Sequence, residues 1–182
     1  MIKALHCALF FFAAYSAGAT TPSTPPPATP AVSQVIHLAL TGRAIRVNID
    51  NREGRIDLDS YVNAAALRQG KILFCRRTRG IIYLVVDLGG PSKIPVDAAH
   101  CGDGEESNMV WIKLASDLKP IEIQSTLYES CWQSVSYKDH YKTHGDELDL
   151  RFTDFANGHG VENWLHYNNR SPDAGFVVLK MN

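Results

Sequence analysis

The sequence predicts a mainly β, single-domain protein, an antiparallel sandwich or barrel of about nine strands with one short helix. Three observations predict this class. Apolar residues recur with a period of two in most segments, turn-forming residues such as Asp50-Asn51 and Gly145-Asp146 separate these segments, and only residues 60–69 resemble a helix. Strand periodicity is the same in a sandwich and in a barrel, so both architectures remain open.

Strands are indicated along most of the chain. In residues 45–50, 109–114 and 148–153, apolar residues alternate with polar or bulky ones, which is typical of strands that bury one face. Residues 81–86 are apolar on both faces and predict a central strand that is covered on both sides. Further strands are expected at residues 35–40, 71–76, 121–132, 134–141, 161–167 and 175–181.

The one helical segment is expected at residues 60–69. Ser60 offers an N-cap, an Ala-rich run follows, and Gly70 comes directly after the segment. Acidic residues precede the start, where negative charge favours the helix dipole. These features together predict a single short helix.

The N-terminal residues 1–19 have the order of an export signal. Lys3 supplies a positive start, an apolar run follows, and small residues precede Thr20, where a signal peptidase would cleave. A membrane-spanning helix needs about 20 apolar residues, so this shorter run predicts cleavage and no membrane span afterwards. We therefore expect a periplasmic or secreted protein.

The rest of the chain is expected to be a leader followed by one domain. Residues 20–32 are rich in Thr and Pro, which predicts an extended, flexible leader. Residues 33–182 have a length that suits a single β-rich globular domain. The whole chain has 18 Lys and Arg against 19 Asp and Glu. This balance gives no electrostatic reason to expect nucleic acid or an anionic membrane as a partner.

Three cysteines follow the predicted signal: Cys75, Cys101 and Cys131. In an oxidising compartment an odd number allows one intramolecular disulfide and leaves one thiol. Spacing alone does not choose the pair. We predict a disulfide between Cys101 and Cys131, because Cys101 lies in an adaptable Gly-rich loop and Cys131 ends an apolar strand. Cys75 lies in an apolar run and is expected to be a buried small hydrophobe.

A contact surface is expected on the irregular segment 89–108 and the strand after it. Long loops on β scaffolds often carry function. Trp111 alternates away from Val110 and Ile112, which predicts that it lies on the exposed face and forms a binding patch. An inward-turned glutamate that braces the loop is the alternative for the acidic residues. The binding candidates are His100, Glu105, Glu106, Trp111 and Lys113.

These features predict an exported, non-enzymatic binding protein. Its expected partner is a protein or an envelope component, including an enzyme that it would inhibit. No catalytic residue, metal ligand or cofactor is predicted, because no motif in the sequence has the spacing that such chemistry needs.

Two other classes of function stay open. A small secreted hydrolase of glycans or peptides would use His100 with nearby acids, or a site of His159, Glu162 and His166. Catalysis by paired carboxylates has the candidates Asp87, Asp97, Glu129 and Asp154, of which no pair stands out. A carbohydrate-binding module would need at least two coplanar exposed aromatic side chains, and burial of Trp111, Trp132 and Trp164 would exclude it.

Overall fold

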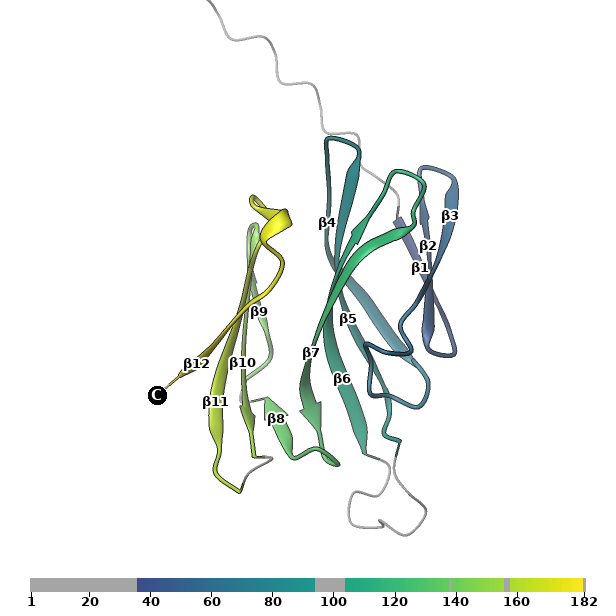
Figure 1. Ribbon diagram of the computed structural model, residues 1–182. Helices are drawn as coiled ribbons and strands as arrows, with labels where there is room; N and C mark the ends of the chain where they lie inside the picture. Colours follow the sequence, from purple (N-terminus) through teal and green to yellow (C-terminus); the bar gives the residue numbers. More distant parts are fainter. Residues whose placement is uncertain (1–35, 94–103, 138, 156–157, 182) are drawn as a thin grey trace, which may run out of the picture. The chain divides into compact units, whose positions relative to one another are not determined.

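The computed structural model describes residues 36–93, 104–137, 139–155 and 158–181, which form strands β1 to β12 and a short 3₁₀ helix, η2 (Figure 1). The strands are β1 (Ile36–Thr41), β2 (Ala44–Ile49), β3 (Arg52–Asp57), β4 (Gln69–Thr78), β5 (Ile81–Pro91), β6 (Glu105–Leu114), β7 (Pro120–Ser130), β8 (Val135–Tyr137), β9 (Lys142–His144), β10 (Glu147–Asp154), β11 (Val161–Asn168) and β12 (Val177–Met181). Helix η2 covers Pro172–Ala174.

The strands form two antiparallel sheets. The small sheet has the order β1-β2-β3, and the large, nine-stranded sheet has the order β12-β11-β10-β8-β7-β6-β5-β4, with β9 paired to β10. Neither sheet closes on itself within the part of the chain that the structure describes. The predicted mainly β, antiparallel fold is therefore confirmed, and the two sheets are consistent with a sandwich-like fold.

The centre of the large sheet is buried on both faces. On one face, Leu84 of β5 and Ile112 of β6 pack with Val47 of β2 in a first core between the two sheets. On the other face, Val85 of β5 and its register partner Trp111 of β6 join residues of β10 and β11 in a second core. The prediction that residues 81–86 are covered on both sides is confirmed, because successive side chains of a strand point to opposite faces.

The predicted helix at residues 60–69 is wrong. One turn forms where the amides of Tyr61 and Val62 both bond to the carbonyl of Leu58, but the chain then continues through an isolated bridge from Ala64 to Ser92 and a bend beside the end of β5. There the Ala65 amide donates to the Pro91 carbonyl at 2.8 Å. Pairing with β5 satisfies these backbone groups, so tertiary contacts override a weak local helix preference.

Other boundaries also differ from the sequence prediction. The irregular segment expected at residues 89–108 is shorter, because β5 continues to Pro91 and β6 begins at Glu105. Strand β3 was not expected, since its sequence REGRID has few apolar residues. It forms because Asp50 and Asn51 adopt positive φ angles of 52° and 61°, the conformation of a tight hairpin turn after β2.

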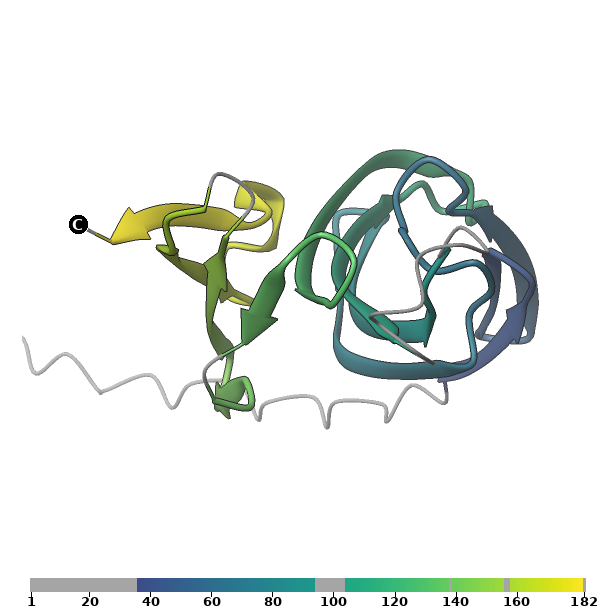
Figure 2. The same cartoon turned by 90° about the horizontal axis from the view of Figure 1, so that it is seen from below.

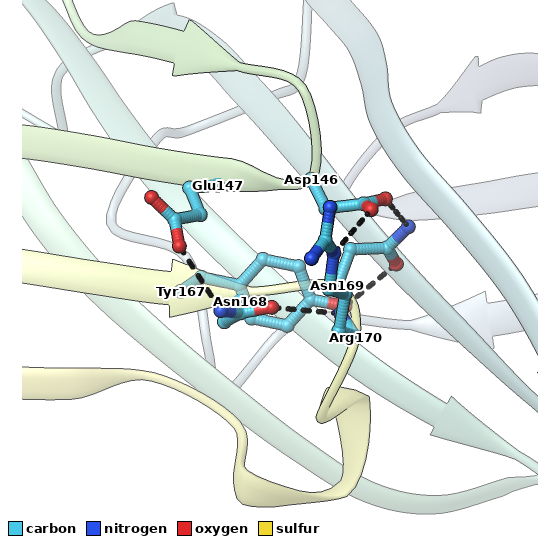
Figure 3. A network of polar contacts seen from close by, with 6 residues as sticks. All are labelled: Asp146, Glu147, Tyr167, Asn168, Asn169 and Arg170. Atoms are coloured by element: carbon cyan, nitrogen blue, oxygen red, sulfur yellow. Dashed lines mark hydrogen bonds and ion pairs between the residues drawn. The ribbon is translucent and has the colours of Figure 1, made fainter.

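A polar network joins the turn before β10 to the segment after β11 (Figure 3). Asp146 accepts hydrogen bonds from the Asn169 side-chain amide at 3.2 Å and from Arg170 Nε at 3.0 Å. Tyr167, the penultimate residue of β11, donates to the Asn169 side-chain oxygen at 3.2 Å, and Asn168 donates to Glu147 at the same distance. The network fixes this end of the β10–β11 pair.

The N-terminal residues 1–35 lie outside the described residues, so the export signal and the leader stay predictions. Among the described residues, none lies in a helix with the length and hydropathy needed to cross a membrane.

Candidate functional site

The expected exposure of Trp111 is wrong. Its side chain is 0% exposed, and its indole nitrogen donates a hydrogen bond to the carbonyl of Pro172 in η2 at 3.0 Å. The ring lies beside Tyr83, with 6.2 Å between the ring centroids. Alternation pointed Trp111 away from the first core, but that face carries the second core. Trp111 is therefore a structural residue of the second core.

The described binding candidates Lys113, Glu106 and Glu105 differ in their surroundings. Lys113 pairs with Asp173 at 2.5 Å, and this hydrogen bond raises the pKa of Lys113. Glu106 is 1% exposed and accepts hydrogen bonds from the hydroxyls of Ser92 and Ser130, so it braces the ends of the neighbouring strands. Glu105 is exposed at the start of β6. His100 lies outside the described residues.

The cysteines are described in part. Cys75 is a free, half-buried cysteine on β4, and burial raises the pKa of its thiol to about 11, although Arg77 opposes this shift. A thiol with so high a pKa stays protonated near neutral pH and is a poor nucleophile. Cys101 lies outside the described residues, so its disulfide with Cys131 stays a prediction.

A recess at one end of the second core brings together several polar side chains and three tyrosines; we call it the tyrosine pocket. It has a volume of about 490 Å³. Its lining residues are Gln69, Asp87, Glu105, Ser107, Tyr128, Glu129, Tyr137, His140 and Tyr141. A smaller recess beside it shares Asp87 and Tyr128 and adds Lys71.

The alternation of β5 and β6 positions this pocket. Asp87 lies on the same face of β5 as Tyr83 and Val85, and its register partner on β6 is Met109. Met109 belongs to the second core, and the next residue of β6 on this face is the polar Ser107. Ser107 of β6 pairs with Glu129 of β7, and the next residue, Asn108, pairs with Leu127. The register therefore shifts by one residue, and Tyr128 is the extra residue of a bulge in β7. Such a bulge re-aims a side chain, and it helps to direct Tyr128 toward Asp87.

Asp87 is the central acceptor of the pocket. The Tyr128 hydroxyl donates to its Oδ1 at 2.7 Å. Burial, followed by the negative charge of Asp87, raises the pKa of Tyr128, and the same causes raise the pKa of Tyr141 to about 12. Both tyrosines therefore stay protonated at neutral pH and act as hydrogen-bond donors.

Aromatic rings and further carboxylates complete the wall. Tyr137 lies edge-on to Tyr128, with ring centroids 6.0 Å apart, and 5.5 Å from the ring of His140. Glu129 accepts a hydrogen bond from the Ser107 hydroxyl at 2.9 Å. At the rim, the ammonium of Lys71 lies 5.8 Å from the centre of the Tyr141 ring, a cation–π contact.

The pocket is therefore acidic. Among the described lining residues of both recesses, three carboxylates, those of Asp87, Glu105 and Glu129, face one cation, Lys71. A positively charged ligand that displaced water from this recess would form charge-assisted hydrogen bonds with the carboxylates and would contact the aromatic faces.

The histidine site considered from the sequence does not form. His166 pairs with Asp149 at 2.9 Å, and the indole of Trp164 donates to the same oxygen. Across the described residues, no group of three or more His, Cys, Asp or Glu could hold a metal ion. His159 and Glu162 therefore do not complete a metal centre with His166.

The three tryptophans give the carbohydrate-binding hypothesis little support. Trp132 is 41% exposed in the turn after β7, whereas Trp111 is buried. Trp164 is half-buried on β11, and its indole N–H is used by Asp149. Of these three residues only Trp132 is exposed, whereas the hypothesis needs two coplanar exposed aromatic side chains.

The sequence contained one partial signal for the tyrosine pocket. Of the four carboxylates considered for paired catalysis, Asp87 and Glu129 line the same recess. Asp154 lies at the end of β10 and lines another recess, and Asp97 is outside the described residues. Asp87 directly follows the apolar run of β5, and a carboxylate there needs a polar partner. The tyrosines come from β7 and beyond, so spacing could not place them with Asp87.

The fold and the pocket define a class: an antiparallel β protein of two sheets with an acidic, tyrosine-lined recess on the larger sheet. No protein-family model, curated protein or solved structure matches the chain.

Proposed function

We propose that the chain is an exported, non-enzymatic binding protein whose tyrosine pocket takes a basic side chain of a protein partner. The observation that carries this proposal is the convergence of Asp87, Glu105 and Glu129 with three tyrosines in one recess. A lysine ammonium or an arginine guanidinium would gain charge-assisted hydrogen bonds from the carboxylates and cation–π contacts from the rings.

The chain itself already places a cation in this way. Lys71 stacks its ammonium on Tyr141 at the rim of the pocket. Lys71 of β4 is the register partner of Asp87 of β5, so the two side chains share a face, and its ammonium lies against the Tyr141 ring at the rim. This intramolecular contact supports a cationic ligand for the tyrosine faces.

A protein partner is favoured over a small apolar molecule. Pockets for such molecules are lined mainly by hydrophobic side chains, whereas this lining is carboxylate, amide, hydroxyl and imidazole with tyrosine. A side chain that extends from a partner surface suits a polar recess of about 490 Å³. The signal-like residues 1–19 support a periplasmic or secreted location, where such a partner would be an envelope or extracellular protein.

The test uses three neutral-ended tripeptides as probes: acetylated and amidated Gly-Lys-Gly, Gly-Arg-Gly and Gly-Glu-Gly. Their binding is followed by NMR chemical shifts of the full domain at 0.15 M salt. We expect the Lys and Arg probes to shift signals of Tyr128, Tyr137 and Tyr141, and the Glu probe to leave them unchanged. Equal effects of all three probes, or none, would overturn the proposal.

Matched variants locate the interaction. Asp87→Asn keeps an acceptor for Tyr128 while it removes the charge, and Glu129→Gln does the same for Ser107. Each should weaken binding of the basic probes by about tenfold, because a hydrogen bond to a charged group contributes roughly 1.5–3 kcal/mol. The control Glu53→Gln removes an exposed carboxylate from β3 and should leave binding unchanged. Equal affinity in all three variants would place the binding elsewhere.

A hydrolase is the second candidate, because Asp87 and Glu129 lie in one recess with His140. Two carboxylates that flank a scissile bond are the usual catalytic pair for glycosides. Incubation of the wild-type chain with oligosaccharide and peptide mixtures, followed by mass spectrometry, tests this reading. Turnover that disappears in Asp87→Asn would replace the binding proposal by a catalytic one.

A further inference from the structure

Strand β12 is the outermost strand of the large sheet (Figures 1 and 2). It pairs with β11 on one side, and no described strand pairs with its other edge. All five of its residues, VVLKM, are exposed. A strand edge of this kind presents backbone donors and acceptors that can pair with another strand.

The side chains of β12 are unusually apolar for an exposed edge. Val177, Val178, Leu179 and Met181 are each 41–46% exposed, and Lys180 is the one charged residue of the strand. Edge strands of monomers are normally protected by bulges, prolines or several charges. β12 has none of these within its bounds, since its pairing with β11 is continuous from Val177 to Met181.

The apolar residues lie mainly on one face. Residues that are directly opposite in an antiparallel pair share a face, and Leu179 is opposite Trp164 while Val177 is opposite His166. Val177, Leu179 and Met181 therefore lie on the face of Trp164, and Val178 and Lys180 lie on the other. The edge carries a short apolar strip bordered by an indole ring.

We propose that β12 pairs antiparallel with β12 of a second copy of this chain, on a two-fold axis at Leu179. In this register Leu179 faces Leu179 of the second copy, and Val177 faces Met181 of the second copy. Lys180 faces Val178 of the second copy, so the two lysines do not oppose each other. The proposal is independent of the tyrosine pocket.

The strand's own sequence favours a second copy over an unrelated partner. A two-fold axis at Leu179 is the register that pairs all five residues. An axis at Lys180 would place two ammonium groups opposite each other, which is destabilising. On the strip face of the joined sheet, every apolar side chain of β12 then meets an apolar side chain of the other copy. Such self-complementarity is what a two-fold interface requires.

Light scattering of the full chain over a concentration series tests this proposal. We expect a dimer for the wild type. Leu179→Lys and Leu179→Glu should each raise the dimer dissociation constant at least tenfold, because like charges then meet on the axis. An equimolar mixture of the two variants should dimerise again, because Lys then faces Glu. The control Ile121→Lys changes another exposed apolar residue, on β7, and should remain dimeric.

Each of the other outcomes overturns the proposal. A monomeric wild type at millimolar concentration would show that β12 does not pair with itself. A dimer that survives Leu179→Lys would place the interface elsewhere, and a mixture that stays monomeric would exclude the axis at Leu179. As a second measurement, oxidised L179C should give a disulfide-linked dimer, whereas V177C should not, because Val177 faces Met181 rather than itself.

Discussion

At the scale of single residues, Trp111 shows why alternation alone can misplace a side chain. Met109, Trp111 and Lys113 share a face of β6, and only Lys113 reaches partial exposure. In a strand that is covered on both faces, successive side chains still point to opposite faces, but neither set of side chains is exposed to solvent. The indole N–H of Trp111 meets the Pro172 carbonyl because the chain returns through η2 after β11.

We predict that Trp111→Ala lowers the free energy of unfolding by about 3–5 kcal/mol, the usual cost of deleting a buried aromatic side chain. The substitution opens a cavity in the second core and leaves the Pro172 carbonyl without its indole donor. Urea denaturation followed by far-UV circular dichroism measures the loss. The control Trp132→Ala removes a 41% exposed ring and should cost well under half as much. Equal losses would contradict the structural role assigned to Trp111.

The tyrosine pocket was predictable only in part, because the sequence indicates single carboxylates but not which side chains meet them. Asp87 could be noticed because it follows an apolar run, and Glu129 because it lies near the end of the strand expected at residues 121–132. Their meeting depends on β6, which lies between β5 and β7, and on a bulge that turns Tyr128 toward Asp87. Register and bulges are tertiary features, so a sequence read segment by segment does not contain them.

At the scale of elements, strands were more predictable than the helix. A period of two persists wherever a sheet buries one face, and this condition holds for β2, β10 and β11. Residues 60–69 had caps and alanines but no apolar stripe that would hold a helix against a sheet. Val62, Ala64 and Leu67 are instead buried in the first core from a non-helical backbone. Caps and composition are weaker than this burial.

The network around Asp146 leads to a prediction about pH. Its hydrogen bond with Arg170, supported by Asn169, lowers the pKa of Asp146 in the folded protein below the ordinary carboxyl value near about 4. The unfolded chain therefore binds this proton first as the pH falls. The stabilisation from Asp146 is fully present above the ordinary carboxyl pKa and is lost as the pH falls through the lowered, folded value.

We therefore expect Asp146→Asn to be less stable than the wild type at pH 7, and the difference between them to shrink below about pH 4. Urea midpoints of both proteins from pH 7 to pH 3 provide the measurement. In an Arg170→Gln background, where the main cause of the lowered pKa is gone, Asp146→Asn should cost less. A difference that stays constant down to pH 3 would contradict this account.

At the scale of the whole described domain, β5 and β6 belong to both hydrophobic cores. Their even-numbered residues, such as Leu84 and Ile112, contribute to the first core, and their odd-numbered residues, such as Val85 and Trp111, contribute to the second. One strand pair thus carries the faces against which the small sheet and the β10–β11 strands pack. Loss of either core removes support from the strands that the other core needs.

This shared strand pair predicts that the two cores unfold in one cooperative transition. Leu84→Ala in the first core and Leu150→Ala in the second should each cost about 2–5 kcal/mol, as expected for a buried leucine. The measurement is native-state hydrogen exchange of β2 amides, beside the first core, and β11 amides, beside the second. If the cores are coupled, each substitution accelerates exchange at both strands by a similar factor, at least about 30-fold for 2 kcal/mol. Acceleration confined to β2 in Leu84→Ala, or to β11 in Leu150→Ala, would mean that the two cores open independently despite the strands they share.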